Sequence, residues 1–323
     1  MLSADSRIFV AGHRGLIGSA LVRVLEARGY RQLLTAGRDE LDLTDGRQVA
    51  AFLSAQRPEV VVMAAGRVGG IVDNTRYPAD LILENLRIQD SMFTAALATP
   101  SVQALVYFGS SCMYPRSAPQ PMAEEAILSA PLEPTSLPYA AAKLAGVMSC
   151  AAINIQYAWP RCWALIPASV YGPHDNFESE SAHVLGALIG RFHHARVTGA
   201  RAVTLWGSGS PRREFVFSED IADAVETVLR SGVVPDGPLN AGAGSDVSIR
   251  ELSALIADAV GYDGEIIWDS NKPDGAPAKL LDSARLNAIG WRAATPLREG
   301  IRRTYDWYRH DRHQGALSDT IGS

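Results

Sequence analysis

The chain has 323 residues, of which 47% are hydrophobic and 20% charged, a composition typical of a soluble globular protein with room for a large domain and a smaller lobe. Its 30 basic and 35 acidic residues give a net charge of −5, which excludes a global basic field that would attract nucleic acid or an anionic membrane. We find no apolar run of the roughly 18 residues that span a bilayer and no signal-peptide pattern before Arg7. Three cysteines, Cys112, Cys150 and Cys162, are too few for a disulfide framework, so we expect a cytoplasmic protein without a metal site.

The first half of the chain alternates short apolar runs with helical patterns. We expect strands at residues 7–12, 33–36, 60–65, 104–108 and 162–166, and helices at 17–28, 45–56, 78–97 and 139–155. The run VVVMAA at 60–65 has no polar alternation, which is typical of a parallel strand covered on both faces. Strands that alternate with helices predict an α/β fold, with a doubly wound parallel sheet of the Rossmann type.

The pattern changes after Tyr171. We expect helices at 181–195, 220–229, 248–260 and 297–308 and a strand at 203–206, with a loosely ordered tail from His310. Ser248 and Glu251 have the spacing of a capping box at the start of one of these helices.

Three glycines follow the first predicted strand and open the first helix. In GHRGLIG (12–18), Gly12 permits a tight turn, Gly15 lets a pyrophosphate approach the backbone, and Gly18 allows close helix–sheet packing. The N–H groups at the start of the helix would bind the anion. A tight turn without a ligand is the alternative, but the strand–turn–helix context favours a dinucleotide site.

The second predicted strand leads to Arg38. A carboxylate at this corner would bind a ribose 2′-hydroxyl and favour NAD, whereas an arginine suits a 2′-phosphate. Arg14, inside the glycine loop, can reach the same corner. We therefore predict NADP(H) as the cofactor, the alternative being two ordinary surface arginines.

Tyr139 and Lys143 lie four residues apart, so they share one helix face. A nearby ammonium is expected to lower the pKa of the phenol, which could then exchange a proton with a carbonyl oxygen as hydride is transferred. Ser110 and Ser111, just after a predicted strand, could hydrogen bond the same oxygen, or could be ordinary loop serines.

The glycine loop, the Tyr139/Lys143 pair and the serines at a strand end resemble the extended short-chain dehydrogenases. Within that class the chain is similar to the GDP-L-fucose synthase family over residues 12–282. The matching stretches are GHRGLIGSA (12–20), RDELDL (38–43), VGGI (68–71), GSSCMYP (109–115), LEPT (132–135), YGPHDNF (171–177), WGSGSPRREF (206–215) and KPDGAPAKLLD (272–282). The resemblance implies an NADPH-dependent enzyme that epimerises C3 and C5 of GDP-4-keto-6-deoxy-D-mannose and reduces its C4 ketone, forming GDP-L-fucose.

The resemblance also implies roles for individual residues. Ser110, Cys112, Tyr139, Lys143 and His183 would be catalytic, with Cys112 and His183 exchanging protons at the carbons beside the ketone. The expected cofactor contacts are Gly12, Arg14, Gly15, Leu16, Ile17, Gly18, Arg38, Ser110, Ser111, Lys143, Pro167, Val170 and His183. The expected GDP-sugar contacts are Arg191, Trp206, Arg213 and Asp274.

The chemistry of these residue types agrees with such roles. Inverting a carbon next to a ketone needs a proton removed from one face and delivered to the other, and a thiol and an imidazole titrate on either side of neutral pH. Taken alone, Cys112 could be a small buried hydrophobe and His183 a helix-surface histidine. Arg191 and Arg213 could be solvated charges, and Trp206 could fill the core of the lobe.

Two stretches depart from the family. Ala168-Ser169 replaces a Thr-Asn pair, and Gly66-Arg67 replaces a small residue followed by lysine. These changes leave open another GDP-4-keto sugar, such as a 6-deoxy-heptose, or an enzyme that only reduces or only epimerises. A 4,6-dehydratase is disfavoured because no acid adjoins Cys112, and a non-catalytic NADP-binding scaffold is disfavoured because all the reactive residues are present.

The expected organisation places an NADP-binding Rossmann domain at 1–170, with part of 215–240 returning to it. A smaller α/β substrate-binding lobe comprises 171–214 and 241–315, and 316–323 form a tail. The resemblance implies a homodimer assembled through the predicted helices at 78–97 and 139–155. We expect a small GDP-sugar partner, and neither nucleic acid nor membrane.

Overall fold

The large domain is built on six parallel strands. The computed structural model describes residues 2–159, 161–177, 182–272 and 274–321. In it the strands follow the order β2-β1-β3-β4-β5-β9, and every neighbouring pair is parallel. Their bounds are β1 (Arg7–Ala11), β2 (Gln32–Leu34), β3 (Val60–Met63), β4 (Ala104–Phe108), β5 (Cys162–Pro167) and β9 (Leu239–Ala241). The predicted doubly wound Rossmann-type sheet is confirmed, and its order reverses between β1 and β3, where such sheets bind ligands.

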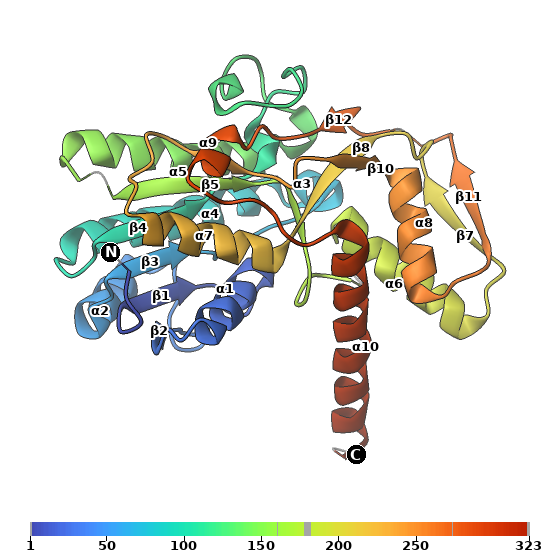
Figure 1. The fold of residues 1–323 in the computed structure, drawn as a ribbon, viewed down its shortest axis with the longest axis horizontal. Coiled ribbons are helices and arrows are strands. Elements are labelled where there is room, and N and C mark those ends of the chain that lie inside the picture. Colours follow the sequence, from blue (N-terminus) through green and yellow to red (C-terminus); the bar gives the residue numbers. More distant parts are fainter. Residues whose placement is uncertain (1, 160, 178–181, 273, 322–323) are drawn as a thin grey trace.

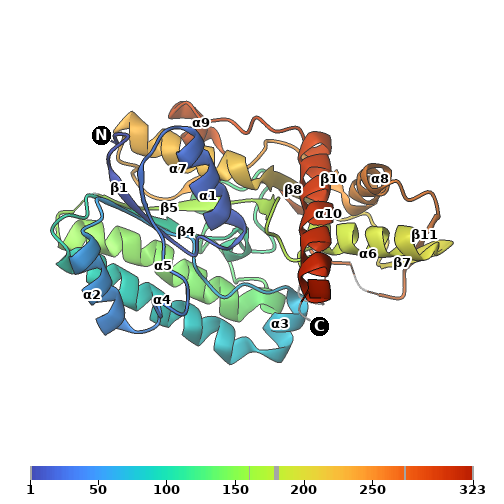
Figure 2. The same cartoon turned by 90° about the horizontal axis from the view of Figure 1, so that it is seen from below.

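Helices cover both faces of this sheet (Figures 1 and 2). One face carries α1 (Leu16–Ala27) and α7 (Ser218–Ser231); the other carries α2 (Gly46–Gln56), α4 (Pro78–Ala98) and α5 (Leu137–Gln156). Asp45 caps α2 by accepting hydrogen bonds from the N–H groups of Arg47 and Gln48. Helix α7 comes from residues 218–231, and its buried Ile221, Val225 and Val228 belong to the core around this sheet.

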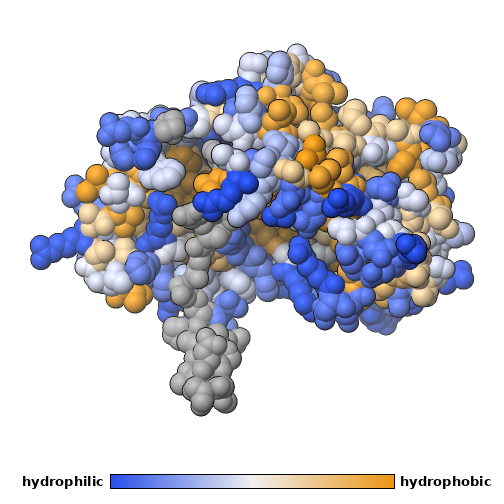
Figure 3. All heavy atoms as spheres, turned by 180° about the vertical axis from the view of Figure 1, so that it is seen from behind, coloured by the Kyte–Doolittle hydropathy of each residue, from blue (hydrophilic) through white to orange (hydrophobic). Residues whose placement is uncertain are grey.

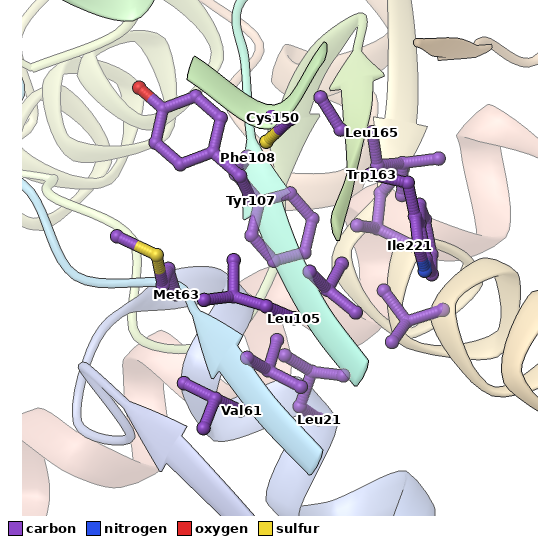
Figure 4. Close-up of a cluster of buried hydrophobic side chains, with 14 of the residues drawn as sticks. Leu21, Val61, Met63, Leu105, Tyr107, Phe108, Cys150, Trp163, Leu165 and Ile221 are labelled. Atoms are coloured by element: carbon purple, nitrogen blue, oxygen red, sulfur yellow. The ribbon is translucent and has the colours of Figure 1, made fainter. Parts of the chain in front are cut away.

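The strands are apolar because both faces are buried. Figure 4 shows side chains from β3, β4 and β5 meeting Leu21 of α1, Cys150 of α5 and Ile221 of α7. All four residues of β3 are buried, which explains the run VVVM. Complete burial of one such side chain contributes roughly 1.5–3 kcal/mol, so this pattern is the main force that sets the sheet.

A second apolar core defines the small lobe. Its strands are β6 (Ser169–Tyr171), β7 (Ala202–Trp206), β8 (Arg212–Phe217), β10 (Asp246–Ser248), β11 (Glu265–Asp269) and β12 (Ala278–Lys279). Its helices are α6 (Val184–Thr198), α8 (Ile249–Val260) and α10 (Leu297–Ile321). Strand β8 pairs with β6, β10 and β12, while β7 pairs with β11. The buried side chains of Leu281, Leu286 and Trp291 join the core of the large domain instead, so the chain crosses between the two cores again after β12.

Short elements complete the chain: α3 (Ile71–Arg76), α9 (Ala284–Ala288) and the 3₁₀ turns η1 (Ser111–Met113), η2 (Glu124–Ala126) and η3 (Pro134–Ser136). The capping box at Ser248 is confirmed, since its side chain accepts from the Glu251 N–H while the Glu251 carboxylate accepts from the Ser248 N–H. The last helix was expected to end at residue 308 but continues to Ile321, beyond His310.

One helical stretch, Pro134–Gln156, is long and apolar enough to cross a membrane by length and composition, which the sequence expectation missed. It contains α5, whose buried residues include Tyr139, Lys143 and Cys150. Core helices of soluble proteins pass the same test, so this stretch is weak evidence for a membrane span.

Candidate active site

The glycine loop forms a tight cradle at the carboxyl end of β1. Gly12 has φ +83°, and a Cβ there would lie 2.6 Å from the Ala65 nitrogen, just after β3. A Cβ on Gly18 would lie 2.1 Å from the Gly12 oxygen, so only glycine permits this contact between loop and helix. Gly15 caps α1 without a side-chain hydrogen bond, which leaves the first N–H groups of the helix for a ligand. The cradle therefore fits a pyrophosphate.

Two arginines flank the loop after β2. A Cβ on Gly37 would lie 3.0 Å from Nη2 of Arg14, so Arg14 reaches from the glycine loop to this corner. Arg38 extends into solvent, with its nearest carboxylate, that of Glu84, 3.9 Å away. Neither guanidinium is held by a short ion pair, since Arg14 lies 4.0 Å from Asp39. Both remain available to a 2′-phosphate.

The turn after β4 presents Ser110 and Cys112. Ser110 caps η1, and its hydroxyl accepts a hydrogen bond from the Cys112 N–H at 3.2 Å. The same hydroxyl lies near the Tyr139 phenol and acts to lower its pKa. The half-buried Cys112 lies close enough for its charge to act on both Tyr139 and Arg213. This turn thus brings together groups from the large domain and from β8 of the lobe.

Lys143 lies beneath this cluster, where it is almost completely buried. Its ammonium donates to the Phe108 carbonyl at 2.9 Å and lies 5.1 Å and 5.9 Å from the ring centres of Tyr107 and Tyr139. Burial lowers the pKa of Lys143 to about 8, because the charged form loses its water.

The expected lowering of the Tyr139 pKa is wrong for the protein without ligands. Burial raises the pKa of Tyr139, the Cys112 charge adds to the rise, and only the nearby Ser110 hydroxyl opposes it. The same lack of water that destabilises the Lys143 ammonium also destabilises a phenolate, and here burial outweighs any attraction to the ammonium. Tyr139 is therefore protonated at neutral pH, as a proton donor to a ketone must be.

The sequence pattern placed His183 inside a helix, and this expectation is wrong. It is the N-cap of α6, which begins at Val184, and residues 178–181 lie outside the described part of the chain. The imidazole is exposed, yet the protein atoms around it lower its pKa by desolvation, as expected for a group at a concave site. Among the described residues no contact joins His183 to Cys112.

The remaining predicted substrate residues lie on the lobe. Arg213 donates to the carbonyls of Arg212 and Ala276, each at 2.7 Å, which fixes its guanidinium. Trp206 is 64% exposed, with the Lys272 ammonium 5.3 Å from its ring centre, so it does not fill the core of the lobe. Asp274 accepts from the N–H and hydroxyl of Ser208 and so shapes the turn after Trp206. Arg191 is exposed on α6.

Comparison with known proteins gives this arrangement its family. The model of the NAD dependent epimerase/dehydratase family matches residues 8–242. The chain belongs to this family. It is 47% identical over 310 residues to GDP-L-fucose synthase 1 of Arabidopsis thaliana, covering 95% of this chain and 94% of that protein. It is 44% identical over 322 residues to GDP-L-fucose synthase of Escherichia coli (strain K12), covering 97% and 100%. Among solved structures, GDP-mannoheptose C4 reductase from Campylobacter jejuni with NADP bound has TM-score 0.86 and 32% identity, covering 96% and 100%.

Pro167 and Val170, two of the expected cofactor contacts, lie where the large sheet meets the lobe. Pro167 ends β5, and Ser169 and Val170 begin β6, whose partners on β8 are Phe215 and Val216. Ala168 is buried and donates to the Ala241 carbonyl at 3.0 Å. Ala168-Ser169, which replaces the Thr-Asn pair of the family, therefore lies where the two domains join.

Sequence reasoning missed two buried amides behind the site. Asn85 donates to the Arg67 carbonyl at 2.8 Å, and Gln89 donates to the Tyr107 hydroxyl at 2.8 Å and to the Ala142 carbonyl at 3.0 Å. The two therefore hold the loop after β3 and the helix turn next to Lys143. The sequence did contain a signal for this role. Asn85 and Gln89 are four residues apart on the apolar helix α4, and two polar residues on one buried helix face require hydrogen-bond partners.

Proposed function

We propose that the chain is an NADPH-dependent epimerase-reductase that converts GDP-4-keto-6-deoxy-D-mannose to GDP-L-fucose. One observation carries the proposal: Ser110, Cys112 and Tyr139 converge above buried Lys143 at the carboxyl end of β4. The chain around them is 44–47% identical to two GDP-L-fucose synthases over nearly its whole length.

The cofactor site fits NADP(H). The cradle of Gly12, Gly15 and Gly18 accommodates a pyrophosphate, and Arg14 and Arg38 suit the 2′-phosphate. Leu16, Ile17, Ser111, Pro167, Val170 and His183 complete the proposed contacts. When bound, NADPH supplies the hydride for the C4 ketone. Lys143 would bind the cofactor and hold a positive charge beside Tyr139.

Tyr139 is the proposed acid for reduction. Its phenol retains its proton because of burial, and the Ser110 hydroxyl lies near it. Ser110 would also hydrogen bond the C4 oxygen, so that the developing oxyanion receives the Tyr139 proton.

Cys112 and His183 are the proposed pair for epimerisation. Protons on C3 and C5 are acidic because the adjacent ketone delocalises the resulting enolate. The His183 imidazole, kept largely neutral by desolvation, would remove a proton from one face and become an imidazolium, and the Cys112 thiol would deliver its proton to the opposite face and become a thiolate. Proton exchange with solvent would then return both groups to their starting forms.

The lobe is the proposed GDP-sugar site. Arg213, fixed by two backbone carbonyls, would bind the sugar end of the substrate near Cys112. The exposed face of Trp206 offers a surface for the guanine base, Asp274 shapes the adjoining turn, and Arg191 would bind diphosphate oxygens. A GDP-heptose substrate is the alternative, since the heptose reductase is similar in structure. The fucose synthases are the nearer in sequence, at 44–47% against 32% identity.

We also propose a cytoplasmic homodimer with the domain division expected from the sequence, except that 281–293 pack on the large domain. The three free cysteines support a reducing compartment. Helices α4 and α5 expose Leu83, Met148 and Ile155, apolar residues suited to a helix-to-helix interface. The face seen from behind in Figure 3 shows hydrophobic patches among hydrophilic residues.

Product identification tests the proposal. The protein, GDP-4-keto-6-deoxy-D-mannose and NADPH in deuterated water should yield GDP-L-fucose labelled at C3 and C5, detected by NMR. Tyr139→Phe should slow NADPH oxidation by about a hundredfold or more while labelling persists. Tyr30→Phe, which loses a buried hydroxyl contact with Glu226 far from the site, is the matched control. If the parent incorporates deuterium but does not oxidise NADPH, the proposed reductase activity is refuted. If it oxidises NADPH without incorporating deuterium, the proposed epimerase activity is refuted.

A further inference from the structure

Asn240 lies at the centre of a buried network behind the turn that carries Cys112. It is the middle residue of β9, the last strand of the large sheet, and is completely buried. Its Oδ1 accepts from the Tyr114 hydroxyl at 2.6 Å, and its Nδ2 donates to the carbonyls of Met122 at 2.9 Å and Asp282 at 3.1 Å. Its backbone N–H donates to Glu124 at 2.8 Å. The side-chain amide thus uses both donors and its acceptor.

The first partner holds the Cys112 turn. Tyr114 is the C-cap of η1, so its side chain leaves the chain two residues after Cys112. The ring is buried, and its hydroxyl is anchored on Asn240. At the other end of the turn, Ser110 accepts from the Cys112 N–H. The turn is therefore fixed at both ends, one through the catalytic serine and the other through Asn240.

The second set of partners joins the same strand to the lobe. Asp282 donates its N–H to the Met122 carbonyl at 2.9 Å, and Met122 donates to the Leu280 carbonyl at 2.7 Å. This segment directly follows β12, in which Lys279 pairs with Arg213 of β8. The Asn240 amide thus binds both the loop after Cys112 and the segment that leads to the Arg213 strand.

The third connection is to the cofactor edge of the sheet. In the pairing of β5 with β9, Asn240 lies opposite Ile166, and Ala241 lies opposite Pro167. One residue therefore joins the Cys112 turn, the Arg213 side of the lobe and the end of β5. Burying a polar side chain at such a junction is costly unless every group is paired, and here the pairing is complete.

We propose that Asn240 is a positioning residue for Cys112. Through Tyr114 it holds the turn that carries the thiol, so that the thiol faces the sugar bound by the lobe. The inference rests on the proposed function. Asn240 reaches this turn through Tyr114, so its loss should misplace the thiol while the Tyr139 and Lys143 positions, fixed by α5 and the Phe108 carbonyl, persist. Epimerisation should suffer and hydride transfer should not.

The main test compares the two half-reactions in Tyr114→Phe, which removes a single hydroxyl. Deuterium incorporation at C3 and C5 of the keto sugar, without NADPH, reports on Cys112. Oxidation of GDP-L-fucose by NADP⁺, followed by NADPH absorbance, reports on hydride transfer without epimerisation. We expect exchange to fall about tenfold and hydride transfer to stay within about twofold, because only the thiol is displaced. Tyr30→Phe should change neither.

Asn240→Asp extends the test. It keeps the shape and the Oδ1 acceptor but turns a carboxylate oxygen towards the carbonyls of Met122 and Asp282, so exchange should fall further than in Tyr114→Phe. If this variant does not fold, the results for Tyr114→Phe are sufficient to test the inference. A parallel loss of exchange and hydride transfer, or a loss of neither, would overturn the inference.

Alkylation separates this inference from the proposed function. Iodoacetamide should label half-buried Cys112 before the buried Cys150 and Cys162 in the native protein. Tyr114→Phe should alter the Cys112 labelling rate and Tyr30→Phe should not. If the parent exchanges no deuterium at all, the epimerase proposal fails while the labelling rates still test the positioning role. Equal rates in the parent and Tyr114→Phe would then overturn it.

Discussion

Replacing Lys143 with methionine should abolish turnover yet stabilise the cofactor-free protein at neutral pH. The ammonium is 5% exposed, and burial lowers its pKa from 10.5 to about 8. This difference between the two pKa values, at about 1.4 kcal/mol for each pH unit, amounts to roughly 3 kcal/mol. That is an order-of-magnitude cost of folding with a charged lysine at this position.

Part of the gain is lost in the variant. Methionine leaves the Phe108 carbonyl without the donor now 2.9 Å away, which costs about 1–2 kcal/mol. The net stabilisation at pH 7 should therefore be about 1–2 kcal/mol. Between about pH 8 and 10.5 the folded parent binds fewer protons than the unfolded chain, so the parent gains stability as the pH rises through this window. The advantage of Lys143→Met should shrink and then reverse.

Urea unfolding of the cofactor-free protein at pH 7 and at pH 10 measures this change directly. Lys272→Met is the matched control, because Lys272 is exposed on the lobe. A free-energy difference between the parent and Lys143→Met that is the same at both pH values would refute the assigned burial cost. Retained turnover in Lys143→Met would refute its place in the site.

Three further outcomes follow from the described contacts. Arg38→Asp should lower the ratio of kcat/KM for NADPH over NADH by about tenfold or more, since it replaces a 2′-phosphate partner with a 2′-hydroxyl partner; an unchanged ratio would contradict this. Gly18→Ala should abolish NADPH binding, measured by fluorescence titration, because its Cβ would lie 2.1 Å from the Gly12 oxygen; wild-type affinity would show that the loop adapts freely. Ser248→Ala should lower the free energy of unfolding by about 1 kcal/mol through loss of the capping box with Glu251, and Ser248→Thr should restore most of it.

Local features of the fold could be read from the sequence. The unbroken apolar run of β3, the glycines after β1 and the capping box of α8 depend on neighbours within a few residues. Periodicity and turn chemistry act at this range, so strands and helices were placed to within a few residues. Among the expected elements the differences lie at the ends, as in α6, which begins at Val184, and α10, which continues to Ile321. The short strands β6, β8, β9, β10, β11 and β12 and the short helices α3 and α9 were not expected from the sequence.

Part of the candidate site also follows from local spacing. Tyr139 and Lys143 share one helix turn, and Ser110 and Cys112 share one 3₁₀ turn. The direction of the Tyr139 pKa did not follow, because it depends on how much water the finished fold excludes. The spacing of Tyr139 and Lys143 is visible in the sequence, whereas their burial depends on all the residues that pack around them in the folded protein.

The sequence by itself determined the alternation of strands and helices, the glycine turn after β1 and the choice of candidate reactive side chains. Only the tertiary structure decided that Arg213 approaches Cys112, that 281–293 return to the large core, and that Asn240 binds Tyr114 from 126 residues away. The physical reason is that such contacts form between segments with no shared periodicity. Their partners are selected by the packing of both cores together, which no local pattern encodes.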